Sequence, residues 1–381
     1  MAGTRWLSPT NGIGPRGLSS RPAPSSGRVG VVSSALSGKA STVLGLIEAE
    51  AMGVTLPHEH LLIDFAVMFK EPAATSEKGL AYQPVSLANV GWVRQNFNAN
   101  LDNLRLLDEQ TALDEIMLFR RAGGQTVVDP TNVSLARDPL ALVRISRATG
   151  LNIVMGAGYY VAAAHPADMD RRSEDSIARE IVQELTVGVG DTGVRAGLIG
   201  EIGNSWPWTE NERKVVRAAV EGQRQTGAPL MIHPGRDQEA PMQILELIQK
   251  QGGDLRRTIM CHIERTIADE RHLLDLAATG VWLEYDLFGL ENSYYPYNPD
   301  FDMPNDGGRM AQILALIARG HQDQVLMSHD IAYKSSLTKY GGYGYHHLLV
   351  NVVPRLRRKG VDDTGLRRLL VENPARAFVF A

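Results

Sequence analysis

The amino-acid sequence predicts a (β/α)8 barrel, an α/β fold of the TIM type, with long loops over the carboxyl-terminal face of the strands. Eight short apolar runs recur along the chain, and most are followed by an amphipathic helical pattern. Such alternation indicates a parallel sheet covered on both faces. An open doubly wound sheet is the rival, but the glycine-rich phosphate turn that it favours does not follow the first run. The predicted strands are Val54–His60, Thr126–Thr131, Asn152–Gly158, Gly197–Ile202, Pro229–His233, Thr258–Ile263, Val281–Asp286 and Val325–Asp330.

The segments between the strands carry their own signals. The stretch Thr209–Thr226 is typical of a helix, because Thr209 can cap it and Glu212 completes a capping box. Two long insertions, Lys70–Asn100 and Leu287–Asp306, follow the first and seventh strands. Both should therefore lie over the carboxyl-terminal face of the barrel. The second insertion is rich in aromatic residues, and it fits a packed lid as well as a surface excursion.

The amino terminus differs from the rest of the chain. Residues 1–36 are rich in Ser, Gly and Pro and hold four Arg but no acid. We predict a disordered or non-native N-terminal extension there, because such a segment cannot bury enough surface to offset its chain entropy. Residues 37–381 would form the barrel. We expect a cytoplasmic protein, or a mitochondrial one if the extension is a transit peptide.

Composition narrows the classes of partner. The 381 residues carry a formal net charge of −4, which does not favour binding to nucleic acid or to an anionic membrane surface. No apolar run approaches the ~18 residues that a membrane span needs. Cys261 is the one cysteine, so an internal disulfide is excluded. We therefore expect a small-molecule substrate, with no nucleic-acid or membrane partner.

Metal-ligating side chains stand at the carboxyl ends of five predicted strands. In a barrel these ends converge on one pocket. A single histidine near a strand end is usually structural, but a matching set on five strands predicts a metal site. In a strand, His58 and His60 share a face about 7 Å apart and can chelate one ion. The candidate ligands are His58, His60, Glu201, His233, His262 and Asp330.

Six ligands exceed what one tetrahedral zinc ion takes, so we predict two divalent metal ions. Glu201 is the natural bridge, because its two oxygens stand on a central strand. The ions would lie about 3.5–4 Å apart and share a hydroxide that serves as nucleophile. Asp330 would ligate one ion, accept the proton of the nucleophile and pass it to the leaving group. The residues thus predict a metal-dependent hydrolase.

At these positions the chain resembles the phosphotriesterase family of the amidohydrolase superfamily, and most of all its phosphotriesterase-related branch. The resemblance covers Leu36 to about Phe380. It is carried by the segments TLPHEHLLIDF, GLIGEIGNSWPWTENERK, MIHPGR, MCHIERT, LEYDLFG and SHDIAYKSSLTKYGGYGYHHLLVNVVP. The combination is specific, although no single segment is.

The resemblance implies how the two ions are held. His58, His60 and Asp330 would bind one ion, and His233 and His262 the other. Glu201 would bridge them, where many family members use a carboxylated lysine. Zinc is the usual metal, although Mn or Co suits the same ligands. Classical members carry a proton-relaying His where this chain has Leu287, which argues against efficient organophosphate hydrolysis.

The branch implies hydrolysis of an N-acyl amino acid or of an N-acetyltaurine-like amide, and the family suggests a homodimer. Arg236 is the candidate for binding an anionic tail, with Lys334 and Lys339 as rivals. Tyr159 is a candidate for the carbonyl or oxyanion, or else forms a pocket wall. A lactonase or phosphotriesterase with the same metal centre is the alternative function. A binding protein without catalysis is the alternative from another class.

Overall fold

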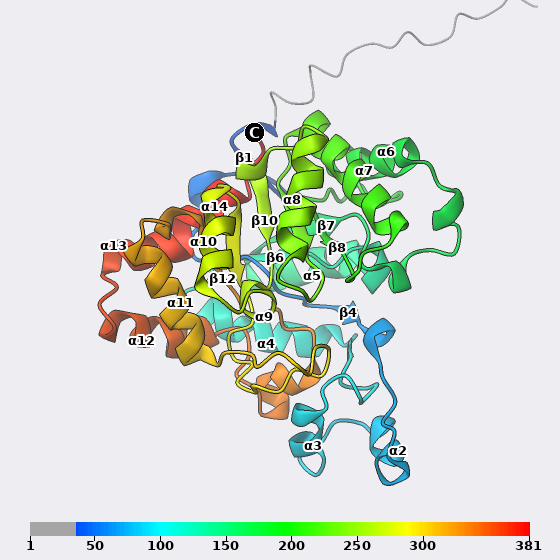
Figure 1. The fold of residues 1–381 in the computed structure, drawn as a ribbon, viewed down its shortest axis with the longest axis vertical. Coiled ribbons are helices and arrows are strands. Elements are labelled where there is room, and N and C mark those ends of the chain that lie inside the picture. Colours follow the sequence, from blue (N-terminus) through cyan, green and yellow to red (C-terminus); the bar gives the residue numbers. More distant parts are fainter. Residues whose placement is uncertain (1–35) are drawn as a thin grey trace, which may run out of the picture.

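The computed structural model describes residues 36–381, and it confirms the predicted (β/α)8 barrel (Figure 1). Eight strands form one sheet in the order β12-β11-β10-β9-β8-β7-β6-β3, and each neighbouring pair is parallel. The predicted extension lies outside the described residues apart from Leu36, which is buried. The barrel strands are β3 (Thr55–Leu56), β6 (Thr126–Asp129), β7 (Asn152–Ala157), β8 (Leu198–Gly203), β9 (Leu230–His233), β10 (Thr258–Met260), β11 (Trp282–Tyr285) and β12 (Val325–Met327).

Helices connect the strands and cover the outside of the barrel. The predicted helix with a capping box is present as α7, where the Thr209 side chain and the Glu212 side chain each accept from the other's backbone N–H. The helices around the barrel are α4 (Glu109–Arg121), α5 (Pro139–Thr149), α6 (Glu174–Thr186), α7 (Glu210–Thr226), α8 (Ala240–Lys250), α9 (Ile263–Thr266), α10 (Glu270–Ala278), α11 (Asp306–Ala318), α12 (Val353–Arg358), α13 (Asp363–Arg367) and α14 (Asn373–Ala377).

The amino-terminal end of the barrel is closed by the two ends of the described chain. The hairpin of β1 (Lys39–Thr42) and β2 (Gly45–Glu48) lies there, and Gly38 N donates to Phe380 O over 2.9 Å. A buried apolar cluster fills the interior of the barrel below the site. This packing leaves only the opposite, carboxyl-terminal end for polar side chains.

The seam between the first and last barrel strands differs from its prediction. We predicted a strand over Val54–His60, but β3 ends at Leu56, because Pro57 has no N–H to donate to a ladder. Beyond β3 the seam is held by His58, whose carbonyl accepts from Asp330 N over 3.1 Å and whose N–H donates to Ser328 Oγ over 3.0 Å. These contacts bring the residues after β3 against those after β12.

The two long insertions meet over the carboxyl-terminal face. The first carries α2 (Thr75–Ala81) and α3 (Val90–Gln95) on an arm at the lower end of Figure 1. The antiparallel pair of β4 (Ile63–Asp64) and β5 (Arg105–Leu106) joins this arm to the barrel. Its residue Phe97 packs in one cluster with three residues of the second insertion, which are Leu287, Tyr295 and Met303. The packed-lid interpretation is therefore favoured over a surface excursion.

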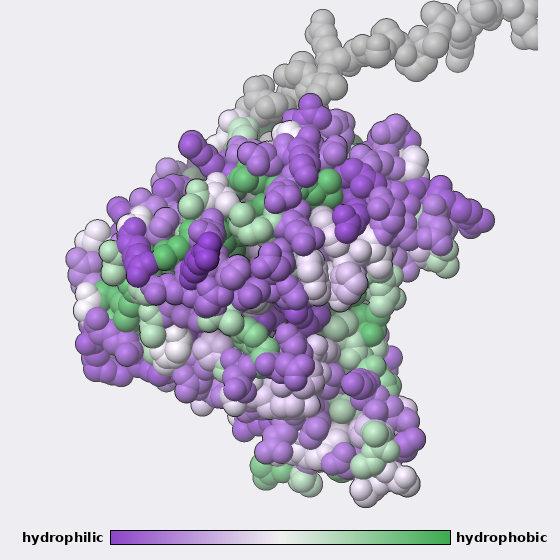
Figure 2. Space-filling model, viewed as in Figure 1, coloured by the Kyte–Doolittle hydropathy of each residue, from purple (hydrophilic) through white to green (hydrophobic). Residues whose placement is uncertain are grey.

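The outer surface is mostly hydrophilic on the face drawn in Figure 2, where hydrophobic residues form small separate areas. Among residues 36–381, no helix combines the length and the apolar character that crossing a membrane requires.

Candidate metal centre

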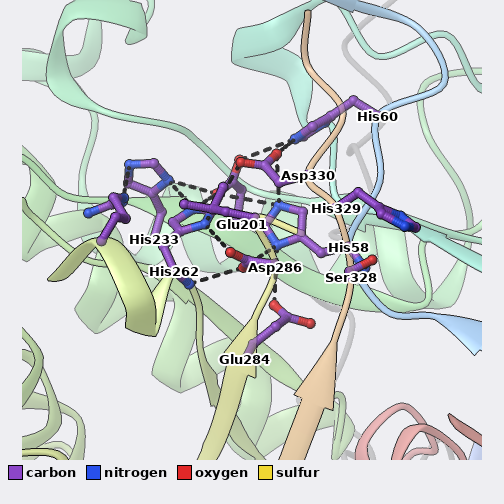
Figure 3. Close-up of polar contacts among 12 residues, drawn as sticks. His58, His60, Glu201, His233, His262, Glu284, Asp286, Ser328, His329 and Asp330 are labelled. Atoms are coloured by element: carbon purple, nitrogen blue, oxygen red, sulfur yellow. Dashed lines mark hydrogen bonds and ion pairs between the residues drawn. The ribbon is translucent and has the colours of Figure 1, made fainter. Parts of the chain in front are cut away.

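The six predicted ligands converge at the carboxyl-terminal end of the barrel (Figure 3). His58 and His60 follow β3, Glu201 lies in β8, His233 ends β9, and the other two follow β10 and β12. The ring centroids of His58 and His262 lie 5.1 Å apart, although the two residues are far apart in the sequence. All six are buried except Asp330, whose side chain is 18% exposed.

Glu201 lies between two groups of imidazoles. Its Oε1 is 3.6 Å from His60 Nε2, whereas its Oε2 is 2.8 Å from His233 Nδ1 and 3.3 Å from His262 Nε2. Asp330 closes the first group, with Oδ1 3.1 Å from His60 Nε2 and 3.6 Å from His58 Nε2. A carboxylate with one oxygen toward each group is suited to a bridging role.

The donor set fits divalent cations. His58 Nε2 is buried and has no hydrogen-bond partner among the described residues, so a neutral His58 would leave a lone pair without a use. His233 Nδ1 and His262 Nε2 approach within 2.8 Å, with Glu201 Oε2 beside both. Imidazole nitrogens and carboxylate oxygens that crowd together in this way are the ligands of Zn²⁺, Mn²⁺ and Co²⁺.

A second layer of polar groups orients the imidazoles. His60 Nδ1 bonds Thr131 Oγ1 at 2.7 Å, and His262 Nδ1 bonds Asp286 Oδ1 at 2.8 Å. His58 Nδ1 lies 3.2 Å from both Glu284 and Asp286. A proton on each of these Nδ1 atoms leaves Nε2 free to face the centre, as is usual for metal-ligating histidines.

The pKa shifts of Glu201 and His233 favour the unprotonated forms that bind a metal, whereas that of His262 favours the protonated form. Burial alone would raise the pKa of the Glu201 carboxyl. The imidazoles beside it, His233 foremost, hold that pKa well below the usual range of a glutamate. Burial lowers the pKa of His233 well below the ordinary value. Burial would also lower the pKa of His262, but the charge and hydrogen bond of Asp286, together with the hydrogen bond to Glu201, raise that pKa to about 9. A bound cation has to displace the proton that His262 takes up, so metal binding releases protons.

Backbone geometry aims three of the ligands. The pairing of β8 with β9 is interrupted between Ile199 and Ile202, and Glu201 lies in this irregularity. Gly200 has a φ of +134°, and a Cβ there would meet Met231 O at 2.5 Å, so only glycine fits. His262 and Asp330 have φ values of 55° and 49°, which are rare for residues with a side chain and are typical of functional positions.

The positive φ of His262 also explains a difference from the predicted strand Thr258–Ile263. The strand β10 ends at Met260, and α9 begins at Ile263. His262 therefore stands at the turn between strand and helix instead of within the strand.

The remaining histidines lie outside the cluster. His329 follows β12 but points away from the other imidazoles in Figure 3, and its Nδ1 bonds Glu59 Oε1 at 2.5 Å. His347 Nε2 bonds Asp306 at 2.6 Å, and His165 Nε2 bonds Tyr160 O at 2.8 Å.

The structure does not bring Tyr159 to the cluster. Its hydroxyl bonds Glu180 Oε1 at 2.5 Å and accepts from Arg172, on the helix side of the barrel. The next residue, Tyr160, takes the inward place, with its hydroxyl 3.3 Å from His233 Nε2. The sequence offered two adjacent tyrosines after β7, and only the turn of the backbone there decides which one faces the site.

A small cavity lies over the cluster. Its volume is about 20 Å³, and it is lined by metal-ligand candidates together with Tyr160, Arg236, Arg265 and Leu287. Arg236, the predicted candidate for binding an anionic tail, follows β9 and lines this cavity. Arg265 was not predicted as a site residue, although it stands in the segment MCHIERT three positions after His262.

Several known proteins are similar to this chain in sequence and in fold. A family model described as "Phosphotriesterase family" matches residues 38–378. The N-acetyltaurine hydrolase of Bos taurus is 42% identical over 348 residues, which cover 91% of this chain and 99% of that protein. A solved resiniferatoxin-binding protein from Rhodobacter sphaeroides is 40% identical, with a TM-score of 0.87 over 91% of this chain and 96% of its own. A lactonase from Listeria monocytogenes is 25% identical, with a TM-score of 0.73 over 90% and 99%.

A barrel with clustered imidazoles and carboxylates at the carboxyl ends of its strands defines the class of metal-dependent hydrolases. Within that class the chain belongs to the phosphotriesterase family, and it is an enzyme of that family.

Proposed function

We propose that this enzyme hydrolyses the amide bond of an N-acyl amine with an acidic tail, of which N-acetyltaurine is the representative, and that it uses two divalent cations. The observation that carries the two-cation proposal is the place of Glu201, with one oxygen toward His60 and the other toward His233 and His262. The substrate class is supported by the similarity to the N-acetyltaurine hydrolase of Bos taurus along almost its whole length.

In this proposal His58, His60 and Asp330 hold one cation, His233 and His262 hold the other, and Glu201 bridges them. When bound, such cations polarise a substrate carbonyl and lower the pKa of water so that a nucleophile exists at neutral pH. The zinc ion is the expected occupant.

The exposure of Asp330 supports a role in moving the proton. It is the most exposed of the six candidates and lines the cavity, so its carboxylate can meet both the substrate and the nucleophilic water. It would take the proton of the nucleophile and deliver it to the leaving nitrogen, which must be protonated before the amide bond breaks.

Lactone hydrolysis is the second candidate, supported by the similarity to the lactonase from Listeria monocytogenes. An alkoxide leaves more readily than an amine, so a site that cleaves amides can also open lactones. Phosphotriester hydrolysis is less favoured. Leu287 lines the cavity and is 7% exposed, and its side chain cannot relay a proton.

The test is metal analysis and a substrate panel on wild type and Glu201→Gln. The panel holds N-acetyltaurine, an acyl-homoserine lactone and paraoxon. We expect about two metal equivalents in the wild type and N-acetyltaurine as the best substrate, and a large loss of both metal and rate in the variant. The control is Glu246→Gln on α8, whose carboxylate is 64% exposed and should not matter.

Each failure has its own signature. A Glu201→Gln protein with full metal content and rate would exclude the bridge. A wild type that prefers the lactone or paraoxon would replace the substrate class, and one that binds metal but turns over nothing on the panel would point to a binding protein.

A further inference from the structure

Two arginines in the cavity have no carboxylate partner. Arg265 is 2% exposed, and Arg236 is half-buried. Neither guanidinium forms an ion pair with a carboxylate among residues 36–381, and both line the same cavity as Glu201, His233 and Asp330. An unpaired charge that is withdrawn from water is costly, so its presence needs a reason.

The fold treats its other fully buried arginine differently. Arg309 is 0% exposed, and its guanidinium lies 3.2 Å from Glu264 and 3.1 Å from Asp306. Arg137, with a side chain that is 2% exposed, pairs with Glu184 at 2.6 Å. These two arginines thus have carboxylate counter-ions in the fold, whereas Arg265 has none.

The contacts of Arg265 leave its charge uncompensated. Nη2 donates to Pro234 O over 3.0 Å, and Nη1 donates to Thr266 Oγ1 over 3.1 Å, but both acceptors are neutral. Nη2 also lies 3.1 Å from His233 Nε2. Since His233 Nδ1 faces Glu201, a neutral ring that ligates through Nδ1 carries its proton on Nε2, where the Tyr160 hydroxyl 3.3 Å away can accept it. His233 then offers the Arg265 guanidinium no acceptor, and the acid group of a substrate could supply one.

Arg236 is held in place by aromatic rings instead of acids. Its Nε donates to Tyr295 Oη over 2.9 Å, and its guanidinium carbon lies 4.7 Å from the centre of the Tyr297 ring. Both tyrosines belong to the second insertion, so the lid orients this guanidinium without neutralising it.

We propose that Arg265 and Arg236 form a two-guanidinium subsite that binds the sulfonate or carboxylate of the substrate, with Arg265 as the residue that selects for negative charge. A guanidinium presents its donors in a fixed fork that suits either oxyanion. Because Arg265 touches the outer nitrogen of His233, whose inner nitrogen faces the metal centre, the acid group binds close to the scissile amide. The subsite therefore selects amides whose acid is separated from the nitrogen by a short spacer.

This inference rests on the proposed amide substrate, and a matched pair of substrates tests it. N-acetyltaurine and N-acetylethanolamine have the same acyl group and spacer, but only the first is charged. The variants are Arg265→Met, which keeps most of the volume, and Arg265→Lys, which keeps the charge. Arg256→Met, at an exposed arginine before β10, is the control. All proteins are full-length and loaded with zinc.

We expect Arg265→Met to raise KM for N-acetyltaurine by about tenfold to a hundredfold, as the loss of charge-assisted hydrogen bonds predicts. Its kcat/KM for N-acetylethanolamine should fall by a much smaller factor than that for N-acetyltaurine, and Arg265→Lys should recover part of the loss. An equal decline for both substrates would show that Arg265 only positions His233, and it would overturn the proposal.

Binding of ethanesulfonate, measured by calorimetry against neutral ethanesulfonamide, tests the subsite without turnover. Wild type should bind the anion more tightly than the sulfonamide, and Arg265→Met should lose this preference. If no amide is hydrolysed, the proposed function fails while this titration still decides the subsite. If the Met variant does not fold, wild type alone decides, because equal KM values for the two amides would refute charge selection.

Discussion

At the scale of single residues, the candidate ligands differ in how freely they can act. Five are locked, since their side chains are buried and hydrogen bonded, whereas Asp330 keeps 18% of its side chain exposed. Its backbone has a φ of 49°, and its N–H is fixed on His58 O across the seam. The structure thus holds the main chain of Asp330 rigidly and leaves its carboxylate facing the cavity.

We expect Asp330→Asn to lower kcat for N-acetyltaurine by about a hundredfold to ten-thousandfold, because the amide cannot carry the proton to the leaving nitrogen. KM should change much less, since Arg265 and Arg236 remain. Steady-state kinetics on zinc-loaded protein measure both quantities. Asp191→Asn, at an exposed loop position, is the control, and a kcat within a few-fold of wild type in the Asp330 variant would contradict the role.

At the scale of elements, one glutamate shows how a helix start can serve the site. Glu212 closes the capping box of α7, but it is fully buried and also accepts from Ala162 N at 2.9 Å and from Ser205 N at 3.0 Å. Ala162 lies in the loop after β7, just beyond Tyr160, and Ser205 lies in the loop after β8, just beyond Glu201. The helix therefore anchors the loops that carry part of the site.

This arrangement predicts that substitutions within the first turn of α7 lower the free energy of unfolding by unequal amounts. Thr209→Ala should lower the free energy of unfolding by about 1 kcal/mol, the usual value of an N-cap. Glu212→Ala should cost more, since each buried donor left without an acceptor costs about 1–3 kcal/mol. Glu210→Ala, whose side chain is 76% exposed, is the control and should cost well under 1 kcal/mol. Urea unfolding curves measure all three, and equal costs for Thr209 and Glu212 would contradict the anchoring role.

At the scale of the whole molecule, the site depends on closing the barrel. Glu59 points away from His58 and His60 and accepts from Ser328 Oγ at 2.8 Å and from His329 N at 3.0 Å. The two insertions add a second closure. The ring centroids of Phe97 and Tyr297, one from each insertion, lie 5.6 Å apart. The Phe97 ring also packs against Tyr333, after β12, with a centroid distance of 4.9 Å. Ligands from both ends of the chain meet only when this seam is formed. The homodimer and the cytoplasmic location expected from the sequence stay predictions.

Cations that join distant parts of the chain should stabilise the fold. We expect a chelator to lower the midpoint of thermal unfolding and zinc to restore it. Free metal at a hundred times its dissociation constant contributes about 2.7 kcal/mol. Differential scanning calorimetry measures the shift, and Glu201→Gln should reduce it. Identical curves with and without metal would contradict a site that couples to folding.

The sequence by itself determined the barrel and the set of candidate ligands. Eight apolar runs alternating with helices define the strands, and a barrel brings the carboxyl ends of its strands to one mouth whatever the loops do. Six candidate ligands could therefore be assigned from their places at strand ends, namely His58, His60, Glu201, His233, His262 and Asp330.

Only the tertiary structure decided what surrounds that set. The choice of Tyr160 over Tyr159 and the turn at His262 depend on backbone torsions after the strands end, where the alternation of faces no longer holds. The missing counter-ion of Arg265 depends on which acids the whole fold brings near, and no local pattern carries that information. The alternation of side chains along a strand tells which face each residue points to. Whether a buried charge has a counter-ion depends on residues that the whole fold brings near it.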